Sequence, residues 1–136
     1  YSAFALQQID YLLASTALGQ QSALDQEAIA AWSKANHWLQ LEVIAADEKI
    51  DKLHAQVEFK AHFQPRKQQD ATQSQDRKQD ALQLQAQQHH EVSYFVQHAG
   101  RWYFLDPTTD QQLGMKKPCV CGSGKKFKLC CAEYIT

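Results

Sequence analysis

Four cysteines lie within thirteen residues near the C-terminus, in an arrangement that suits metal binding. One residue separates Cys119 from Cys121, and eight residues separate this pair from the adjacent Cys130 and Cys131. Tetrahedral zinc takes four such sulfur ligands at about 2.3 Å, and two close pairs joined by a short loop supply them at a small entropic cost. The spacing therefore predicts a zinc site formed by Cys119, Cys121, Cys130 and Cys131.

Disulfide bonds and free structural thiols are the alternatives to zinc. Adjacent Cα atoms are about 3.8 Å apart, below the usual range of about 4.4–6.8 Å, so Cys130 and Cys131 do not easily bridge each other. Cross-pairing between the two cysteine pairs is geometrically possible. A domain with its own apolar core needs no such staples, and thiols in the cytosol stay reduced, so zinc is favoured. Four protein ligands close the coordination sphere, which predicts a structural rather than a catalytic ion.

The residues around the cysteines fit this interpretation. Gly122 and Gly124 permit positive φ angles, so that peptide N–H groups can point at the sulfurs together with the Ser123 hydroxyl. Five lysines stand against one acid from residue 114 onward, which gives this segment a charge of +4 in a chain whose net charge is −1. The lysines are Lys116, Lys117, Lys125, Lys126 and Lys128. Because four thiolates around Zn²⁺ contribute about −2, a segment of about +2 follows an acidic body.

Two helices are predicted before any strand. Residues 1–16 carry apolar side chains every three or four positions, which predicts an amphipathic helix, and Gly19 supplies a stop signal after it. A second helix is predicted to begin near Ser22, because residues 22–25 resemble a capping box, and to end near Asn36.

Alternating apolar residues then predict a sheet of antiparallel strands. The strands are expected over residues 38–45, 53–63, 92–96 and 101–105, with turns at 47–49 and at Gly100. Helices followed by strands predict an α+β domain at residues 1–110, whose helices pack on the apolar face of a bent sheet. A linker and the zinc-binding segment are expected at 111–136.

Residues 64–88 interrupt this pattern because they are rich in glutamine and contain few apolar side chains. A connection of this length between neighbouring strands is unusual, so we expect an insertion that is either mobile or a polar helical excursion. No chemistry is expected there.

One row of polar residues has the side-chain types of a metal or acid–base constellation. Residues four apart on a strand lie about 13 Å apart, so His54, Glu58 and His62 are too distant to share one ion. Pairing Phe59 with Tyr94 would align the apolar faces of their strands and place His62 beside Glu91. We interpret that pair as a surface hydrogen bond in preference to a proton shuttle.

Several other residues could line a pocket, although aromatic side chains at periodic positions usually belong to a core. They are Asp10, Tyr11, Trp32, Tyr94, Trp102 and Tyr103. No nucleophile with an evident base accompanies them, so we name no catalytic residue and expect a non-enzymatic protein.

Residues 118–131 resemble the SEC-C motif, the zinc-binding tail of the SecA translocation ATPase, which there contacts the SecB chaperone. The body resembles the YchJ family of uncharacterised bacterial proteins. The segments that carry this resemblance are residues 1–4, 10–13, 57–59, 90–93 and 100–103. It implies a fold like nuclear transport factor two (cystatin-like), a cone of bent antiparallel sheet closed by helices, and no known reaction. It also implies a second cysteine motif before Tyr1.

These observations predict a zinc-stabilised interaction protein of the bacterial cytosol, whose basic zinc-binding end docks on a chaperone-associated protein or a ribosomal surface. Small-molecule binding or enzymatic activity in the cone pocket is the alternative. No apolar stretch approaches the roughly 20 residues that span a bilayer, so we expect no membrane span. The net charge of −1 gives no specific signal for nucleic acid, and the sequence leaves the oligomeric state open.

Overall fold

A computed structural model describes residues 1–66, 85–109 and 114–135, so most of the glutamine-rich insertion lies outside the described residues. None of the described helices has the length and apolar character needed to cross a membrane. The helices of the first third are α1 (Ser2–Ala5), α2 (Ile9–Ala14), the 3₁₀ helix η1 (Leu18–Ala23) and α3 (Gln26–Ala35). The strands are β1 (Asn36–Asp47), β2 (His54–Pro65), β3 (Gln87–His98) and β4 (Arg101–Leu105), and η2 (Phe127–Leu129) and α5 (Ala132–Ile135) complete the chain.

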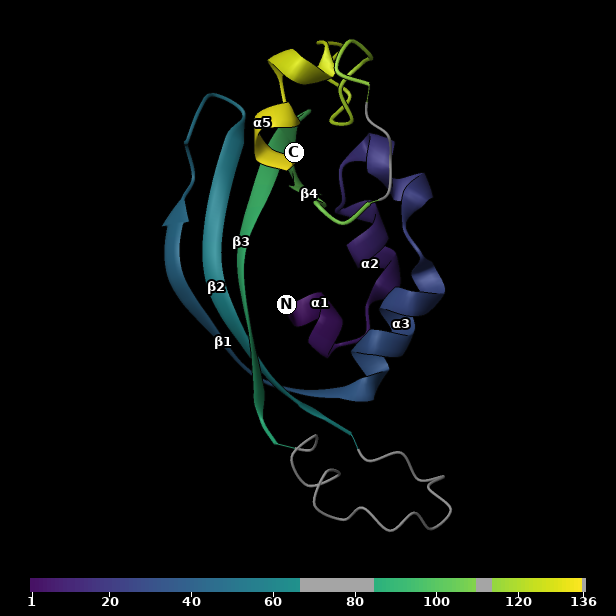
Figure 1. Cartoon of the computed structure of the whole chain (residues 1–136), viewed down its shortest axis with the longest axis vertical. Coiled ribbons are helices and arrows are strands. Elements are labelled where there is room, and N and C mark those ends of the chain that lie inside the picture. The colour runs from purple at the N-terminus through teal and green to yellow at the C-terminus, as the bar shows by residue number, and fades with distance from the viewer. Residues whose placement is uncertain (67–84, 110–113, 136) are drawn as a thin grey trace.

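The strands form one antiparallel sheet in the order β1-β2-β3-β4, and the helices of the first third face one side of it (Figure 1). Two register shifts in β1, at residues 38–40 and 43–45, add unpaired residues that bend the strand. The tight turn between β3 and β4 has positive φ at Ala99 (48°) and Gly100 (76°), as a two-residue hairpin requires. The predicted α+β architecture with a bent sheet is confirmed.

The predicted helix over residues 1–16 is wrong, because the chain forms two short helices there. Gln7 has a positive φ of 55° and ends α1 in a Schellman arrangement. Its N–H donates to the Phe4 carbonyl at 3.1 Å, and the N–H of Gln8 donates to the Ala3 carbonyl at 2.8 Å. These bonds satisfy the last carbonyls of α1 and turn the chain before α2.

The second helix begins three to four residues later than predicted. Residues 18–23 form η1, and the N-cap of α3 is Asp25, whose side chain accepts a hydrogen bond from the Ala28 N–H at 2.9 Å. The helix is therefore capped by Asp25, whereas the sequence predicted a start near Ser22. The predicted end at Asn36 is confirmed.

One end of the sheet is held to the helices by an aromatic cluster. Trp38 of β1 lies 4.8 Å from Trp32 of α3 and 5.7 Å from Phe63 of β2 between ring centroids. Phe4 of α1 joins the cluster, 5.5 Å from Trp32. The Ser33 hydroxyl donates to the Phe4 carbonyl at 2.6 Å, which ties α3 to α1.

The predicted pairing of β2 with β3 is wrong by three residues. Phe59 pairs with Glu91, and Tyr94 pairs with Gln56. Because directly paired residues share a face, Tyr94 and Val96 lie on the same side of the sheet as His54, opposite Phe59. Apolar side chains therefore occupy both faces of the sheet instead of one.

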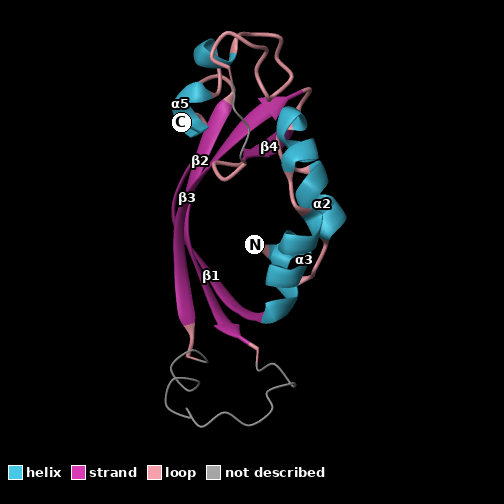
Figure 2. Cartoon of the chain, turned by 45° about the vertical axis from the view of Figure 1, so that its right-hand side comes forward, coloured by secondary structure: helices cyan, strands magenta, loops and turns pink. Residues whose placement is uncertain are grey.

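The cysteine-rich segment at residues 114–135, called the knuckle below, covers this second apolar face at one end of the sheet (Figure 2). A single buried cluster joins the two parts, and the knuckle is thus fixed on the body. From the body it contains Ala17, Val96 and Leu105, and from the knuckle Cys119, Val120, Cys121, Phe127, Cys131 and Ala132.

Main-chain and amide hydrogen bonds support the same end. The Ala17 N–H donates to the Phe104 carbonyl at 2.8 Å, which pairs the segment after α2 with β4. Gln20 is fully buried, and its side chain bonds the carbonyl and the N–H of Asp106 at 2.8 and 3.0 Å. A buried amide with both ends satisfied holds the chain after β4 in place.

Replacing Gly19 by alanine is expected to destabilise the protein by about 1–3 kcal/mol, because overpacking forces neighbouring backbone to shift. The Gly19 N–H donates to the Val120 carbonyl at 2.7 Å, and an added Cβ would lie 2.9 Å from the Val120 Cα. Urea unfolding measures the change. In the control Gly114→Ala the added Cβ meets the flexible side chain of Lys117 at 3.1 Å, and equal losses in both variants would contradict the close contact.

Candidate metal centre

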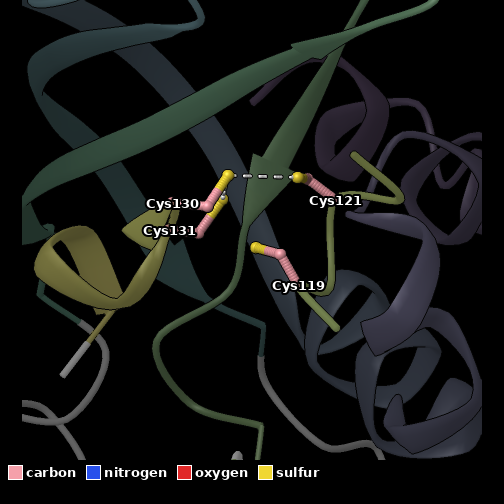
Figure 3. A group of neighbouring side chains, drawn as sticks. All are labelled: Cys119, Cys121, Cys130 and Cys131. Atoms are coloured by element: carbon pink, nitrogen blue, oxygen red, sulfur yellow. Dashed lines mark hydrogen bonds between the residues drawn. The ribbon is translucent and has the colours of Figure 1, made fainter. Parts of the chain in front are cut away.

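The four cysteine sulfurs converge between the loop that follows Pro118 and the junction of η2 with α5 (Figure 3). All four lie within 4.8 Å of one another, and none is in a disulfide. The sulfur of Cys130 is 3.6 Å from that of Cys121 and 3.8 Å from that of Cys131. Four sulfurs at about 2.3 Å from one tetrahedral ion are about 3.8 Å apart, so the donor set fits zinc.

The local chain conformation brings the two pairs together. Gly122 and Gly124 have φ angles of 81° and 75°, as predicted, and allow the tight loop between the pairs. The Cys119 N–H donates to the Lys125 carbonyl at 2.8 Å, which closes this loop. Phe127 is 1% exposed and belongs to the same buried cluster as Cys119, Cys121 and Cys131. Three of the cysteines are buried, and only Cys130 is partly exposed.

Cys121, Cys130 and Cys131 differ in how strongly they hold their thiol protons. The pKa of Cys121 lies far below its ordinary value, because Cys119 and Cys131 hydrogen-bond to its sulfur and the Ser123 N–H also contributes. Hydrogen bonds to Cys119 and Cys121, together with burial, raise the pKa of Cys131, and burial raises the pKa of Cys130 to about 11. A bound cation would have to displace the protons that the raised pKa values retain, so its binding would release protons.

His54, considered above only together with Glu58 and His62, lies at the cysteine site. It begins β2, is 2% exposed, and places Nε2 3.3 Å from the sulfur of Cys131. Its Nδ1 lies 2.8 Å from a carboxylate oxygen of Asp51. No local motif could reveal the contact, because 77 residues separate His54 from Cys131.

Asp51 is held in its charged form by a set of donors. Burial opposes its ionisation, but hydrogen bonds from the Leu53 N–H, the Tyr134 hydroxyl and His54 outweigh this and lower its pKa to about 2. The Tyr134 hydroxyl donates to Asp51 at 2.9 Å, and burial together with this bond raises the pKa of Tyr134 to about 12.

The other two residues of the polar row lie apart from the centre. Glu58 pairs with His90 at 2.8 Å and His62 with Glu42 at 3.6 Å, both on the sheet surface. The expected pair of His62 with Glu91 does not form, because the register places Glu91 on the opposite face of the sheet.

Glu91 instead contacts His89 and Ser93 of its own strand. The residues that were candidates for lining one pocket do not lie together. Glu91 is 2.8 Å from His89 and accepts a hydrogen bond from Ser93. Asp10 and Tyr11 line a surface hollow of about 390 Å³ with residues 7–9. The remaining aromatic residues lie in the aromatic cluster, beside the knuckle or on the surface: Trp32, Tyr94, Tyr103 and Trp102.

Comparison with known proteins matches both parts of the chain. Residues 1–107 match the family model described as YchJ, middle NTF2-like domain, and residues 115–133 match the SEC-C motif. The chain belongs to the YchJ family. Among YchJ relatives named UPF0225, a protein of Actinobacillus succinogenes is 36% identical over 135 residues, which are 99% of this chain and 76% of the relative. One of Haemophilus influenzae is 38% identical, over 99% of this chain and 72% of the relative.

Two solved structures resemble this YchJ family member along most of its length. The crystal structure of a SEC-C motif containing protein from Psychrobacter arcticus has a TM-score of 0.77 and 42% identity, and covers 99% of this chain and 70% of that one. The solution structure of a SEC-C motif containing protein from Rhodopseudomonas palustris has a TM-score of 0.60 and 28% identity, with coverages of 78% and 69%. The predicted family and the NTF2-like fold are confirmed.

Purified protein is expected to contain about one zinc ion per chain, because four converging thiols bind the ion as thiolates. Elemental analysis measures the metal content, with Cys121→Ser as the ligand-deficient control. Removal of the ion by a chelator should lower the melting temperature of the whole chain, since the ligands lie in the core shared with the sheet. A metal-free protein with four reactive thiols would show that the cysteines have another role.

Proposed function

We propose that this protein is a zinc-stabilised, non-enzymatic interaction module of the bacterial cytosol, and that its knuckle docks on an acidic protein surface of a chaperone-associated or ribosomal partner. The observation that carries the proposal is the exposure of every lysine around a largely buried sulfur cluster. These exposed lysines are Lys116, Lys117, Lys125, Lys126 and Lys128.

The positions of sulfurs and lysines divide the knuckle into an inner and an outer side. Cys119, Cys121 and Cys131 are 5%, 2% and 0% exposed, so an ion held by them is enclosed by protein. Four protein ligands leave no open coordination position for a substrate, which favours a structural ion. The side that a partner can reach is therefore the lysine-bearing side.

Apolar side chains among the lysines favour a protein partner over a nucleic acid. Leu129 is 68% exposed and Met115 is 46% exposed. They lie on connected parts of the surface, since the Lys128 N–H donates to the Met115 carbonyl at 3.1 Å. Exposed methionine and leucine bordered by charges are typical of protein interfaces, whose centres exclude water.

The uneven distribution of charge along the chain would orient a partner toward the knuckle. The segment from residue 114 carries +4 before metal binding, whereas the rest of the chain carries −5. An acidic partner surface would be attracted by the knuckle and repelled by the body. Charge therefore orients the encounter, and the apolar side chains supply contact area once the partner has arrived.

Reversing two knuckle lysines, Lys125→Glu together with Lys128→Glu, is expected to reduce partner capture about tenfold, because the attraction to an acidic surface is lost. The control reverses Lys34 and Lys49, which are exposed on the body and change the net charge equally. Quantitative affinity capture from bacterial lysate at two salt concentrations compares the variants, after equal zinc content has been verified. The same partners in the same amounts for both variants would contradict a docking role of the knuckle.

A further inference from the structure

His54 connects the sulfur cluster to the turn between β1 and β2. Its Nε2 lies 3.3 Å from the sulfur of Cys131, and both atoms are shielded from solvent because the two residues are 2% and 0% exposed. His54 is not one of the mutually close donors, which among the described residues are the four sulfurs. Four thiolates already complete a tetrahedral site, so His54 contacts a ligand and is not a ligand itself.

The opposite side of the imidazole ring is held by Asp51 and Tyr134. Nδ1 lies 2.9 and 2.8 Å from the two carboxylate oxygens of Asp51. Asp51 also accepts the backbone N–H groups of Leu53 and His54 at 2.7 and 2.8 Å, which fixes the carboxylate in the turn. The Tyr134 ring packs 4.3 Å from the imidazole between centroids, while its hydroxyl donates to Asp51.

The chemistry of these partners sets the role of each nitrogen. A carboxylate accepts hydrogen bonds, so Nδ1 donates to Asp51. A metal-bound thiolate also accepts. A neutral imidazole carries only one N–H, so a ring that donates from Nδ1 to Asp51 and from Nε2 to Cys131 is an imidazolium lying between two anionic groups. Outer-shell donors of this kind disperse charge from a ligand atom and fix its position, and their loss typically reduces metal affinity about tenfold to a hundredfold.

We infer that His54 is a positioning residue of the metal centre, that its Nε2–H donates to the metal-bound sulfur of Cys131, and that Asp51 and Tyr134 hold the ring in the required orientation. The inference rests on the metal binding proposed above and goes beyond it. Because His54 begins β2 and Asp51 lies in the preceding turn, occupancy of the centre is coupled to the end of the β1–β2 hairpin.

The test compares metal release from the zinc-loaded full chain into an excess of chelator, together with the sulfur-to-cobalt charge-transfer band of the cobalt-substituted protein. His54→Leu should release zinc about tenfold to a hundredfold faster and shift the band, because no donor faces Cys131. His54→Gln should stay within about threefold of the unmodified chain, since its amide N–H replaces Nε2–H. Purely structural packing would not separate leucine from glutamine in this way.

Two further variants make the outcome decisive. His90→Leu removes a histidine that is paired with Glu58 at 2.8 Å on the same face of the sheet, and it should change neither the rate nor the band. Asp51→Asn should accelerate zinc release less than His54→Leu does. Because Asp51 is exposed, its replacement should leave the fold intact, and this variant provides the test if His54→Leu does not fold. The inference would be overturned if His54→Leu had the same release rate and the same band as His90→Leu. If His54→Leu does not fold, the same result for Asp51→Asn would overturn it. Equally fast release from His54→Leu and His54→Gln would also overturn it. An unmodified chain without metal would instead overturn the proposed metal binding on which the inference rests.

Discussion

The apolar core between the knuckle and the sheet is the packing interaction on which one end of the molecule depends. The knuckle is too short to form a core of its own, and Val120 and Phe127 are buried in one cluster with Val96 and Leu105 of the sheet. The sheet depends on the knuckle in the same way, because Val96 and Leu105 would otherwise face solvent. Binding of an ion by the cysteines would therefore stabilise both the ligand loops and the end of the sheet that they cover.

This shared core also explains the unusual distribution of apolar residues over the sheet. A sheet with one covered face shows a simple alternation of apolar and polar residues in every strand. Here helices cover the face of Phe63 at one end, whereas the knuckle covers the face of Tyr94 at the other. Apolar and polar residues alternate in both β2 and β3, but the apolar residues around Phe59 and those around Tyr94 lie on opposite faces of the sheet. Aligning Phe59 with Tyr94 assumed a single covered face and therefore gave the wrong register.

The sequence predicted features whose causes lie close together in the chain. The positive φ of Gly122 and the placing of helices before the strands have local causes, and both were predicted correctly. The break at Gln7 was missed because a positive φ at a residue other than glycine has no reliable sequence signal. The roles of His54 and Asp51 depend on partners 77 and 83 residues away, so only the tertiary structure reveals them.

A metal bound by the four cysteines would affect the proposed docking surface in two opposing ways, one through its shape and one through its charge. Loss of a zinc ion with reprotonation of four thiolates would raise the charge of the knuckle from about +2 to +4, and charge alone would then strengthen attraction to an acidic partner. The same loss frees the loop between Gly122 and Phe127, so that binding must pay the entropy of ordering it. A partner that recognises the arrangement of Lys125 and Lys128 therefore requires the metal, whereas a partner that responds to charge alone binds the metal-free chain more tightly.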